Sequence, residues 1–193
     1  MRLKRLEILG YKSFANRTEI IFEEGVTAVV GPNGSGKSNV ADALRWVLGE
    51  TNVRHLRGKK SDDLIFAGSN GRGQLGMAQV SLTLDNSAGW YRPPMEAARG
   101  RAKLADSVLA GAPAEVTITR RLYRDGSGEY WINGQRARLG DVYQLLAQGG
   151  VSGETYVVVG QGLVDQALSL RPDERRAMLD EAAGVKPLQA KRE

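Results

Sequence analysis

One short segment combines glycines, a lysine and a serine at a spacing suited to phosphate chemistry. Residues 31–38 read Gly-Pro-Asn-Gly-Ser-Gly-Lys-Ser and fit the pattern G-x-x-x-x-G-K-[ST]. Glycines let backbone N–H groups turn inward around a phosphate, and a following helix adds its N-terminal partial positive charge. Lys37 would add a full charge against the β- and γ-phosphates, and Ser38 would offer a hydroxyl to Mg²⁺. The pattern predicts binding of ATP or GTP with Mg²⁺.

The segments on either side of this motif fit the context that it requires. Residues 26–30 form a short, mostly apolar run that suits a buried strand. Residues 38–48 predict a helix that ends at Gly49. Its apolar face would carry Val40, Leu44, Val47 and Leu48. The alternative, a glycine-rich turn with an incidental Lys-Ser pair, is disfavoured because motif and context agree.

Much of the remaining sequence predicts an antiparallel sheet beside the phosphate-binding unit. Residues 78–84 alternate between apolar and polar side chains, and Val116, Ile118 and Leu122 fall on one face of a second strand. Turn signals at 125–128 and 133–134 bracket a third. Earlier strands are expected near 3–8 and at 19–22, and a later one at 155–159. Helices are expected at 95–109, 139–148 and 172–184, and residues 50–76 as an irregular basic excursion.

Composition bounds the class of protein. The chain has 193 residues, of which 41% are hydrophobic and 25% charged, and this predicts one globular domain or slightly more. It has no Cys and one His, so a disulfide framework and a Cys- or His-rich metal site are excluded. No apolar stretch predicts a membrane span or a secretory signal. A net charge of +5 weakly favours an anionic partner such as nucleic acid.

A complete hydrolase of this type also needs a Walker B element, an apolar strand ending in Asp and often followed by Glu. Residues 81–85 end in Asp, but Asn86 follows and the run alternates. Residues 179–181 contain Asp-Glu, but the preceding residues are charged and helical in pattern. A Leu-Ser-Gly-Gly signature is also missing. The sequence therefore predicts only half of a catalytic site.

The chain resembles the N-terminal half of the head of a structural maintenance of chromosomes (SMC) ATPase, most closely the bacterial form. The matching stretches, in family order, are residues 10–14, 31–39, 43–50, 56–58, 64–69, 82–86, 160–162 and 180–184. The resemblance implies an α/β P-loop NTPase lobe of the ABC-ATPase head type. It would have a mixed sheet with an added antiparallel sheet in residues 1–170, with 87–114 as a variable excursion. Residues 171–193 would form a helix leading into a coiled coil.

The resemblance also implies how such a lobe works. The signature motif and Walker B would lie in a distant C-terminal half of the same head, so hydrolysis would require that half. Two completed heads of a homodimer would sandwich ATP and Mg²⁺, and their engagement and release would drive DNA entrapment, loop extrusion or compaction. The implied partners are kleisin-type subunits and double-stranded DNA, without a membrane. The implied location is the bacterial cytoplasm at the nucleoid.

Family roles carry over to matching positions. Phosphate-binding positions would be Gly31, Pro32, Asn33, Gly34, Ser35, Gly36, Lys37, Ser38 and Asn39. Lys12 and Ser13 would lie near the nucleotide, and Ser38 and Gln161 would bind Mg²⁺. Lys37, Arg57 and Gln161 would be catalytic, with Arg57 at the arginine-finger position. Without the resemblance, Gln161 reads as a loop glutamine between two glycines, and Arg57 as one charge in a solvated basic loop.

Basic residues cluster in two places. Arg54, His55, Arg57, Lys59 and Lys60 lie within seven positions, and Arg136 and Arg138 follow the turn at 133–134. By resemblance, Lys60 and Arg138 would contact DNA phosphates without reading sequence. The alternative is a solvated charged loop. Gly140 stands where the family often has a further lysine, which weakens the correspondence there.

Three other classes of protein remain as alternatives. A split-head ABC-type ATPase of DNA double-strand-break repair is the nearest, and residues 66–69 and 180–184 argue against it. A self-contained P-loop kinase or GTPase would need a Walker B element within this chain. A DNA-binding module could instead use the nucleotide only as a structural or regulatory switch.

Overall fold

The computed structural model describes residues 1–69, 71–92, 113–150, 171, 173 and 176. By its internal contacts the chain divides into two units, Met1–Gly150 and Val151–Glu193. The helices predicted at 95–109 and 172–184 and the strand predicted at 155–159 lie outside the described residues, so they stay predictions, as does a lobe ending at residue 170. No helix in the described part of the chain is long and apolar enough to cross a membrane.

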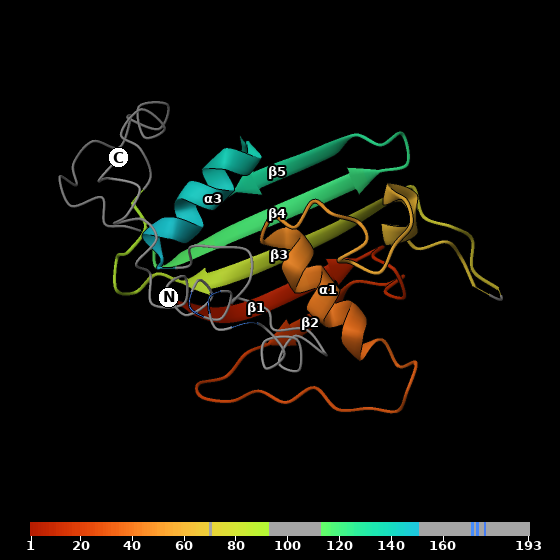
Figure 1. Ribbon diagram of the computed structural model, residues 1–193, viewed down its shortest axis with the longest axis horizontal. Helices are drawn as coiled ribbons and strands as arrows, with labels where there is room; N and C mark the ends of the chain where they lie inside the picture. Colours follow the sequence, from red (N-terminus) through yellow and green to blue (C-terminus); the bar gives the residue numbers. More distant parts are fainter. Residues whose placement is uncertain (70, 93–112, 151–170, 172, 174–175, 177–193) are drawn as a thin grey trace. The chain divides into compact units, whose positions relative to one another are not determined.

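The first unit is built on one six-stranded antiparallel sheet (Figure 1). Its strand order is β2-β1-β3-β4-β5-β6, so β1 lies between β2 and β3. The strands are β1 (Arg2–Leu9), β2 (Thr18–Ile21), β3 (Met77–Asp85), β4 (Glu115–Tyr123), β5 (Gly128–Ile132) and β6 (Gln135–Ala137). The turns predicted near 125–128 and 133–134 connect β4 to β5 and β5 to β6, as the glycine and asparagine signals indicate.

The sheet departs from the predicted arrangement in its strand directions and in the absence, among the described residues, of one predicted strand. All described strand pairs are antiparallel, and β1 and β2 belong to the same sheet as the later hairpins, so the described residues form no mixed sheet. Residues 26–30 were expected to be a buried strand, but they form no strand, and Val26 is 97% exposed and Val30 87%. An apolar run of this kind is buried only when neighbouring strands and packing helices cover it, and no described strand pairs with it.

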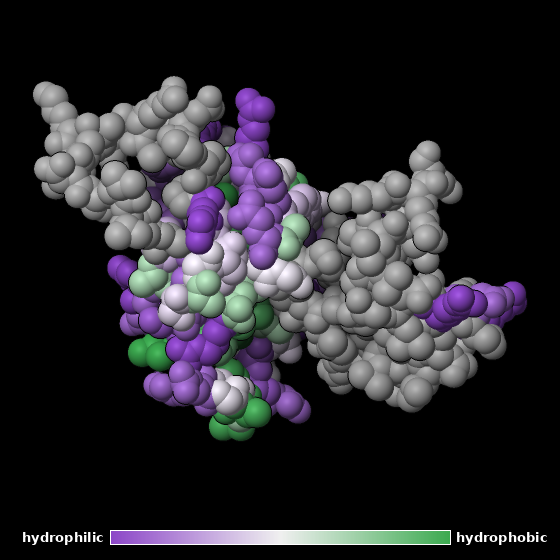
Figure 2. Space-filling view, turned by 90° about the vertical axis from the view of Figure 1, so that its left-hand side faces the viewer, coloured by the Kyte–Doolittle hydropathy of each residue, from purple (hydrophilic) through white to green (hydrophobic). Residues whose placement is uncertain are grey.

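The segment between β2 and α1, which contains this run, lies at the lower edge of the view in Figure 1. In the perpendicular view, apolar green residues are visible at the lower edge of the described surface, among hydrophilic purple ones (Figure 2). Val26, Val29 and Val30 of the segment between β2 and α1 are exposed large apolar side chains.

The alternation of the strands separates a core face from a polar face. Side chains on the core face are fully buried, among them Leu6, Ile8, Val80, Leu82 and Ile118. Helices α1 (Lys37–Val47) and α3 (Leu139–Gln148) lie on one face of the sheet (Figure 1), where α1 contacts β3 and β4 and α3 contacts β5. Residues 50–76, expected as an irregular excursion, include the 3₁₀ helix η1 (Ser61–Leu64) and also contribute buried apolar side chains.

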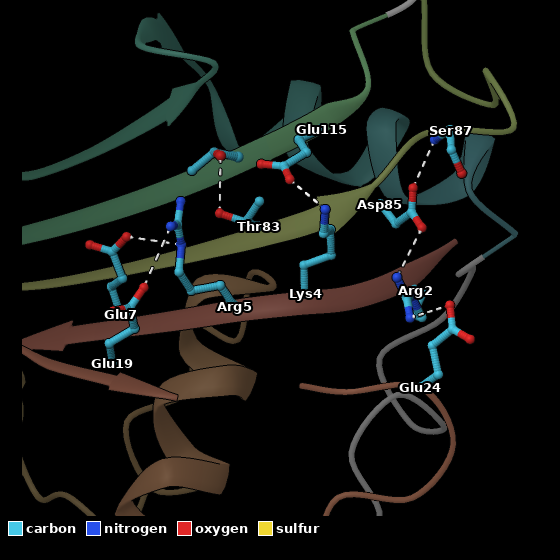
Figure 3. A network of polar contacts seen from close by, with 11 residues as sticks. Arg2, Lys4, Arg5, Glu7, Glu19, Glu24, Thr83, Asp85, Ser87 and Glu115 are labelled. Carbon is cyan, nitrogen blue, oxygen red and sulfur yellow. Dashed lines mark hydrogen bonds and ion pairs between the residues drawn. The ribbon is translucent and has the colours of Figure 1, made fainter. Parts of the chain in front are cut away.

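The polar face is covered by ion pairs and paired hydroxyls across the strands (Figure 3). Lys4 of β1 reaches Glu115 of β4 at 2.6 Å, and Thr83 of β3 contacts the hydroxyl of Thr117 at 3.1 Å. Arg5 contacts Glu7 and Glu19 on β1 and β2. Thr83 and Thr117 lie directly opposite each other on β3 and β4, so their hydroxyl contact supports the register of these two strands. The Lys4–Glu115 ion pair instead spans β3, which lies between β1 and β4.

The buried face of helix α1 overlaps with the predicted one only at Val47. The buried residues are Asp42, Ala43, Trp46 and Val47, whereas Val40, Leu44 and Leu48 are only half-buried. Trp46 occupies the sheet-facing position because its large ring packs on Tyr11, with the ring centroids 5.1 Å apart. Cations on neighbouring segments compensate the charge of Asp42, so a carboxylate can occupy a core position.

The C-terminal end of α1 is fixed to the sheet by Arg120. This residue lies on the core face of β4, and its guanidinium stacks between the rings of Trp46 and Tyr130, 4.8 Å from each centroid. It donates hydrogen bonds of 2.7 Å to the carbonyl oxygens of Trp46 and Glu50. Burial lowers the pKa of the guanidinium from its ordinary value, and the two carbonyls replace the water it has lost.

Replacing Arg120 with methionine should lower the free energy of unfolding by about 2–4 kcal/mol, because the helix-end carbonyls lose charged donors in a buried setting. Urea unfolding followed by circular dichroism measures this. Lys4→Met is the matched control, since its ion pair with Glu115 is partly exposed and should cost less than about 1 kcal/mol. Equal stabilities of the Arg120 variant and the unmodified chain would show that the stacked guanidinium contributes nothing to the fold.

Candidate nucleotide-binding site

The segment at residues 31–36, called the phosphate loop from here on, curls back on itself just before α1. Gly34 and Gly36 have φ angles of 82° and 94°, in the left-handed region that glycine adopts at little cost. The Ser35 N–H donates to the Pro32 carbonyl at 3.3 Å. No side chain caps the helix that begins at Lys37, so the start of α1 is open toward the loop. Such an arrangement suits an anion.

Lys37 adds a positive charge to this loop. Its Nζ donates to the carbonyls of Gly31 and Pro32, at 2.6 and 2.7 Å, so the ammonium lies back across the loop that precedes it. Ser38 is exposed in the first turn of α1. The structure therefore places the glycines, Lys37 and Ser38 at the N-terminal end of α1.

A buried carboxylate lies one turn further along the helix. Asp42 Oδ2 accepts hydrogen bonds from Lys12 Nζ at 2.5 Å and from Arg57 Nε and Nη2 at 2.9 and 2.6 Å. Lys12 Nζ also donates to the Leu56 carbonyl. Asp42 was not predicted from the sequence. The only sequence signal for it is an acidic residue on the buried face of the helix. That signal can be read only when the buried face is known.

Both cations are presented by backbone in the left-handed region, with φ of 47° at Lys12 and 56° at Arg57. For side chains other than glycine this costs of order 1–3 kcal/mol each. Tertiary packing holds the two positions: the Lys12 N–H donates to the Leu64 carbonyl at 2.9 Å, and the Arg57 N–H to the Arg54 carbonyl at 3.0 Å. The adjacent Leu56 is fully buried and anchors the second turn.

Two polar side chains connect this charge cluster to the phosphate loop. Arg57 Nη2 donates to Asn39 Oδ1 at 3.0 Å, and Asn39 Nδ2 donates to Ser13 Oγ at 2.8 Å. A Cβ added to Gly36 would lie 3.0 Å from the same Ser13 oxygen. Ser13, Asn39 and Arg57 thus lie together beside the start of α1, while the Lys12 ammonium is directed at Asp42 and Leu56.

Tyr11 is a fully buried neighbour of Asp42. Burial raises the pKa of its phenol well above the ordinary range, and the negative charge of Asp42 raises it further. The hydroxyl is therefore neutral at any ordinary pH, and it has no hydrogen-bond partner among the described residues. The carboxylate accordingly depends on Lys12 and Arg57 for its stabilisation.

The two predicted DNA-contacting residues lie at the starts of two separate helices. Lys60 precedes η1 and Arg138 precedes α3, and the backbone N–H of each donates to an aspartate three residues later, Asp63 at 3.0 Å and Asp141 at 2.7 Å. Backbone hydrogen bonds from residues 59 and 60 lower the pKa of Asp63. In the described part of the chain, no hydrogen bond or ion pair joins Lys60 to Arg138.

The predicted metal ligands are represented only in part. Ser38 is described, whereas Gln161 lies outside the described residues. The described residues contain no group of three or more His, Cys, Asp or Glu side chains able to hold a metal ion. One hydroxyl beside a glycine-lined loop suits a Mg²⁺ that arrives with phosphate oxygens of its own, rather than one held in a protein cage.

Comparison with protein families adds to this geometry. Residues 2–155 match the family described as "RecF/RecN/SMC N terminal domain". The chain belongs to this family. The predicted resemblance to a bacterial SMC head is confirmed by a curated relative, "Chromosome partition protein Smc" of Mycolicibacterium paratuberculosis. It is 50% identical over 185 residues, which cover 96% of this chain and 14% of the relative. The chain therefore spans about one seventh of the length of that SMC protein.

Solved structures of SMC heads have the same fold. One, described under ATP-driven dimerization and DNA-stimulated activation of SMC ATPases, is 32% identical with a TM-score of 0.79, covering 94% of this chain and 99% of that one. Another is the Smc head of Pyrococcus furiosus with an extended coiled coil, bound to the C-terminal domain of ScpA. It is 32% identical with a TM-score of 0.81, covering 98% of this chain and 44% of that one.

Replacing Asp42 with alanine should destabilise this SMC-family chain by about 3–5 kcal/mol, because the largely buried Lys12 ammonium loses its counter-ion. The free energy of unfolding in urea is the quantity to compare. Glu115→Ala provides the control, since it removes a carboxylate from an exposed ion pair and should cost less than about 1 kcal/mol. Similar losses in the two variants would mean that the buried position of Asp42 has no special energetic weight.

Proposed function

We propose that this chain is the ATP-binding N-terminal part of the head of an SMC-type chromosome partition ATPase. The observation that carries the proposal is the phosphate loop itself, with two left-handed glycines and Lys37 folded back over it. Its occurrence in a chain that belongs to the SMC family supports ATP as the ligand. The nucleotide would lie against residues 31–39, with Lys12 and Ser13 on the neighbouring segment.

The proposed roles join the family resemblance to the chemistry of each residue. Backbone N–H groups of the loop and the start of α1 hold the phosphates, and Lys37 balances their charge. Ser38 and Gln161 bind Mg²⁺, which when present neutralises charge on the phosphate oxygens. The planar Arg57 guanidinium, half-exposed beside the loop, stabilises charge that spreads during phosphoryl transfer.

Hydrolysis needs residues that this chain does not supply. The described acidic side chains form no cluster beside the loop, and the sequence contains no convincing Walker B or signature element. We infer that a C-terminal half of the same head provides them and that its strands cover residues 26–30, which completes the mixed sheet. A second head then engages across ATP, and a kleisin-type subunit binds. The related SMC head structures, described with ATP-driven dimerization and with a bound ScpA domain, support this for their own proteins.

Double-stranded DNA is the proposed macromolecular ligand. Lys60 and Arg138 present charges next to η1 and α3, and such residues bind phosphates irrespective of sequence. A related solved structure is described under DNA-stimulated activation of SMC ATPases. We place the complete protein at the bacterial nucleoid in the cytoplasm, with the helix of residues 171–193 leading into its coiled coil.

The isolated chain should bind ATP with Mg²⁺ and should not hydrolyse it, because the site is only half present. Lys37→Ala should weaken binding at least about tenfold, as the loss of one charged partner of the phosphates implies. Equilibrium binding of a fluorescent ATP analogue and phosphate release measure the two quantities. Adding a matching C-terminal half should then restore turnover. Turnover by the chain alone that disappears in Lys37→Ala would contradict the half-site proposal.

Lys60→Glu combined with Arg138→Glu should weaken binding of a DNA duplex and lower the slope of log K against log salt by roughly two, about 0.9 for each lost phosphate contact. Fluorescence anisotropy over a series of salt concentrations provides the slope. Lys4→Glu with Arg17→Glu changes the net charge equally at two strand-side positions and is the control. Equal effects of the two double variants would remove Lys60 and Arg138 from the DNA surface.

A further inference from the structure

One carboxylate holding two cations is the least expected feature beside the phosphate loop. Asp42, Lys12 and Arg57 all meet at a single oxygen, Asp42 Oδ2. The three side chains differ sharply in exposure: Asp42 is 3% exposed, Lys12 11% and Arg57 50%. The cluster is therefore asymmetric, with a buried pair and an outer guanidinium.

This asymmetry determines which cation can leave. Removing the sole partner of a buried charge costs several kcal/mol, because the charge is left uncompensated. Asp42 has two partners, so one can depart while the other remains. Lys12 is nearly buried and also bonded to the Leu56 carbonyl, which fixes it in place. Arg57 is half-exposed and is the partner that can be released.

The released guanidinium would start close to the phosphate loop. Arg57 bonds to Asn39, whose backbone N–H donates to the Gly36 carbonyl at 2.8 Å, and Asn39 also bonds to Ser13 beside Gly36. Phosphate oxygens accept the planar guanidinium fork as well as a carboxylate does. A polyphosphate carries several negative charges, whereas Asp42 offers Arg57 one oxygen that it already shares with Lys12.

We propose that Asp42 is a positioning residue that holds the Arg57 guanidinium beside the phosphate loop and releases it to the polyphosphate when nucleotide binds, while Lys12 stays as the counter-ion of the carboxylate. This inference rests on the proposed function, since it requires a nucleotide at residues 31–38. It assigns distinct roles to the two cations: Lys12 makes the exchange inexpensive, and Arg57 moves.

The first test follows the Arg57 side chain directly. In ¹⁵N-labelled chain, the Nε–H signal of Arg57 is assigned by its loss in Arg57→Lys, and a non-hydrolysable ATP analogue with Mg²⁺ is titrated. The signal should shift and exchange with water at a changed rate, saturating together with the backbone amide of Gly36. A Gly36 amide that shifts beside an unmoved Arg57 signal would overturn the exchange and leave nucleotide binding intact. Two unmoved signals would overturn the proposed function and the inference with it.

The second test removes the charge that makes release inexpensive. In Lys12→Met, Arg57 becomes the only counter-ion of Asp42, so the nucleotide should no longer shift the Arg57 signal, and affinity should fall about three- to tenfold. Lys12→Arg keeps the charge and should restore the shift. Lys4→Met, which removes a lysine from the exposed pair with Glu115, should respond as the unmodified chain does. An undiminished Arg57 shift in Lys12→Met would show that Lys12 has no part in the exchange, and the first test still decides the proposal if that variant does not fold.

Discussion

The site depends on electrostatic fixing of α1 at its middle and at its C-terminal end. In the middle of the helix, Asp42 bonds to Lys12 and Arg57 from two separate segments of the chain. At the C-terminal end, Arg120 reaches up from the sheet to the last carbonyls and stacks on Trp46. A helix held in this way cannot slide or rotate on the sheet without separating buried charges, which is costly. The phosphate loop therefore has a defined orientation even though the loop itself is exposed.

The sequence was a good guide wherever structure depends on neighbours along the chain. The phosphate loop, the helix after it, the hairpin turns and α3 were all predicted within a few residues, because glycines, alternation and apolar spacing are local signals. Arg120 and Asp42 were not predicted. Arg120 bonds to a carbonyl 74 residues away and Asp42 to a lysine 30 residues away. A charged residue on an apolar face has no interpretation until its distant partner is known.

The prediction of a buried strand at residues 26–30 was wrong for a related reason. Its composition is typical of a buried segment, but burial is a property of the assembled sheet, and the described strands leave the run uncovered. The predicted buried face of α1 also differs from the observed one. Trp46, with its large ring, and Asp42, whose charge is compensated, are buried in place of most of the predicted apolar residues. The roles proposed for Gln161, Lys60 and Arg138 come from the family resemblance.

The uncovered valine run has a practical consequence for handling the molecule. A β-branched, uncharged segment with unpaired backbone groups readily adds to a like segment on another molecule, so a chain left in this state is prone to aggregate. Charged residues or proline usually flank such stretches as gatekeepers, and Glu23, Glu24 and Pro32 flank this one, but residues 26–30 themselves contain no charge and no proline. Co-expression with the polypeptide that covers residues 26–30 would then prevent aggregation as well as allow assembly. The yield of monodisperse protein would show that the run is covered before any enzymatic assay does.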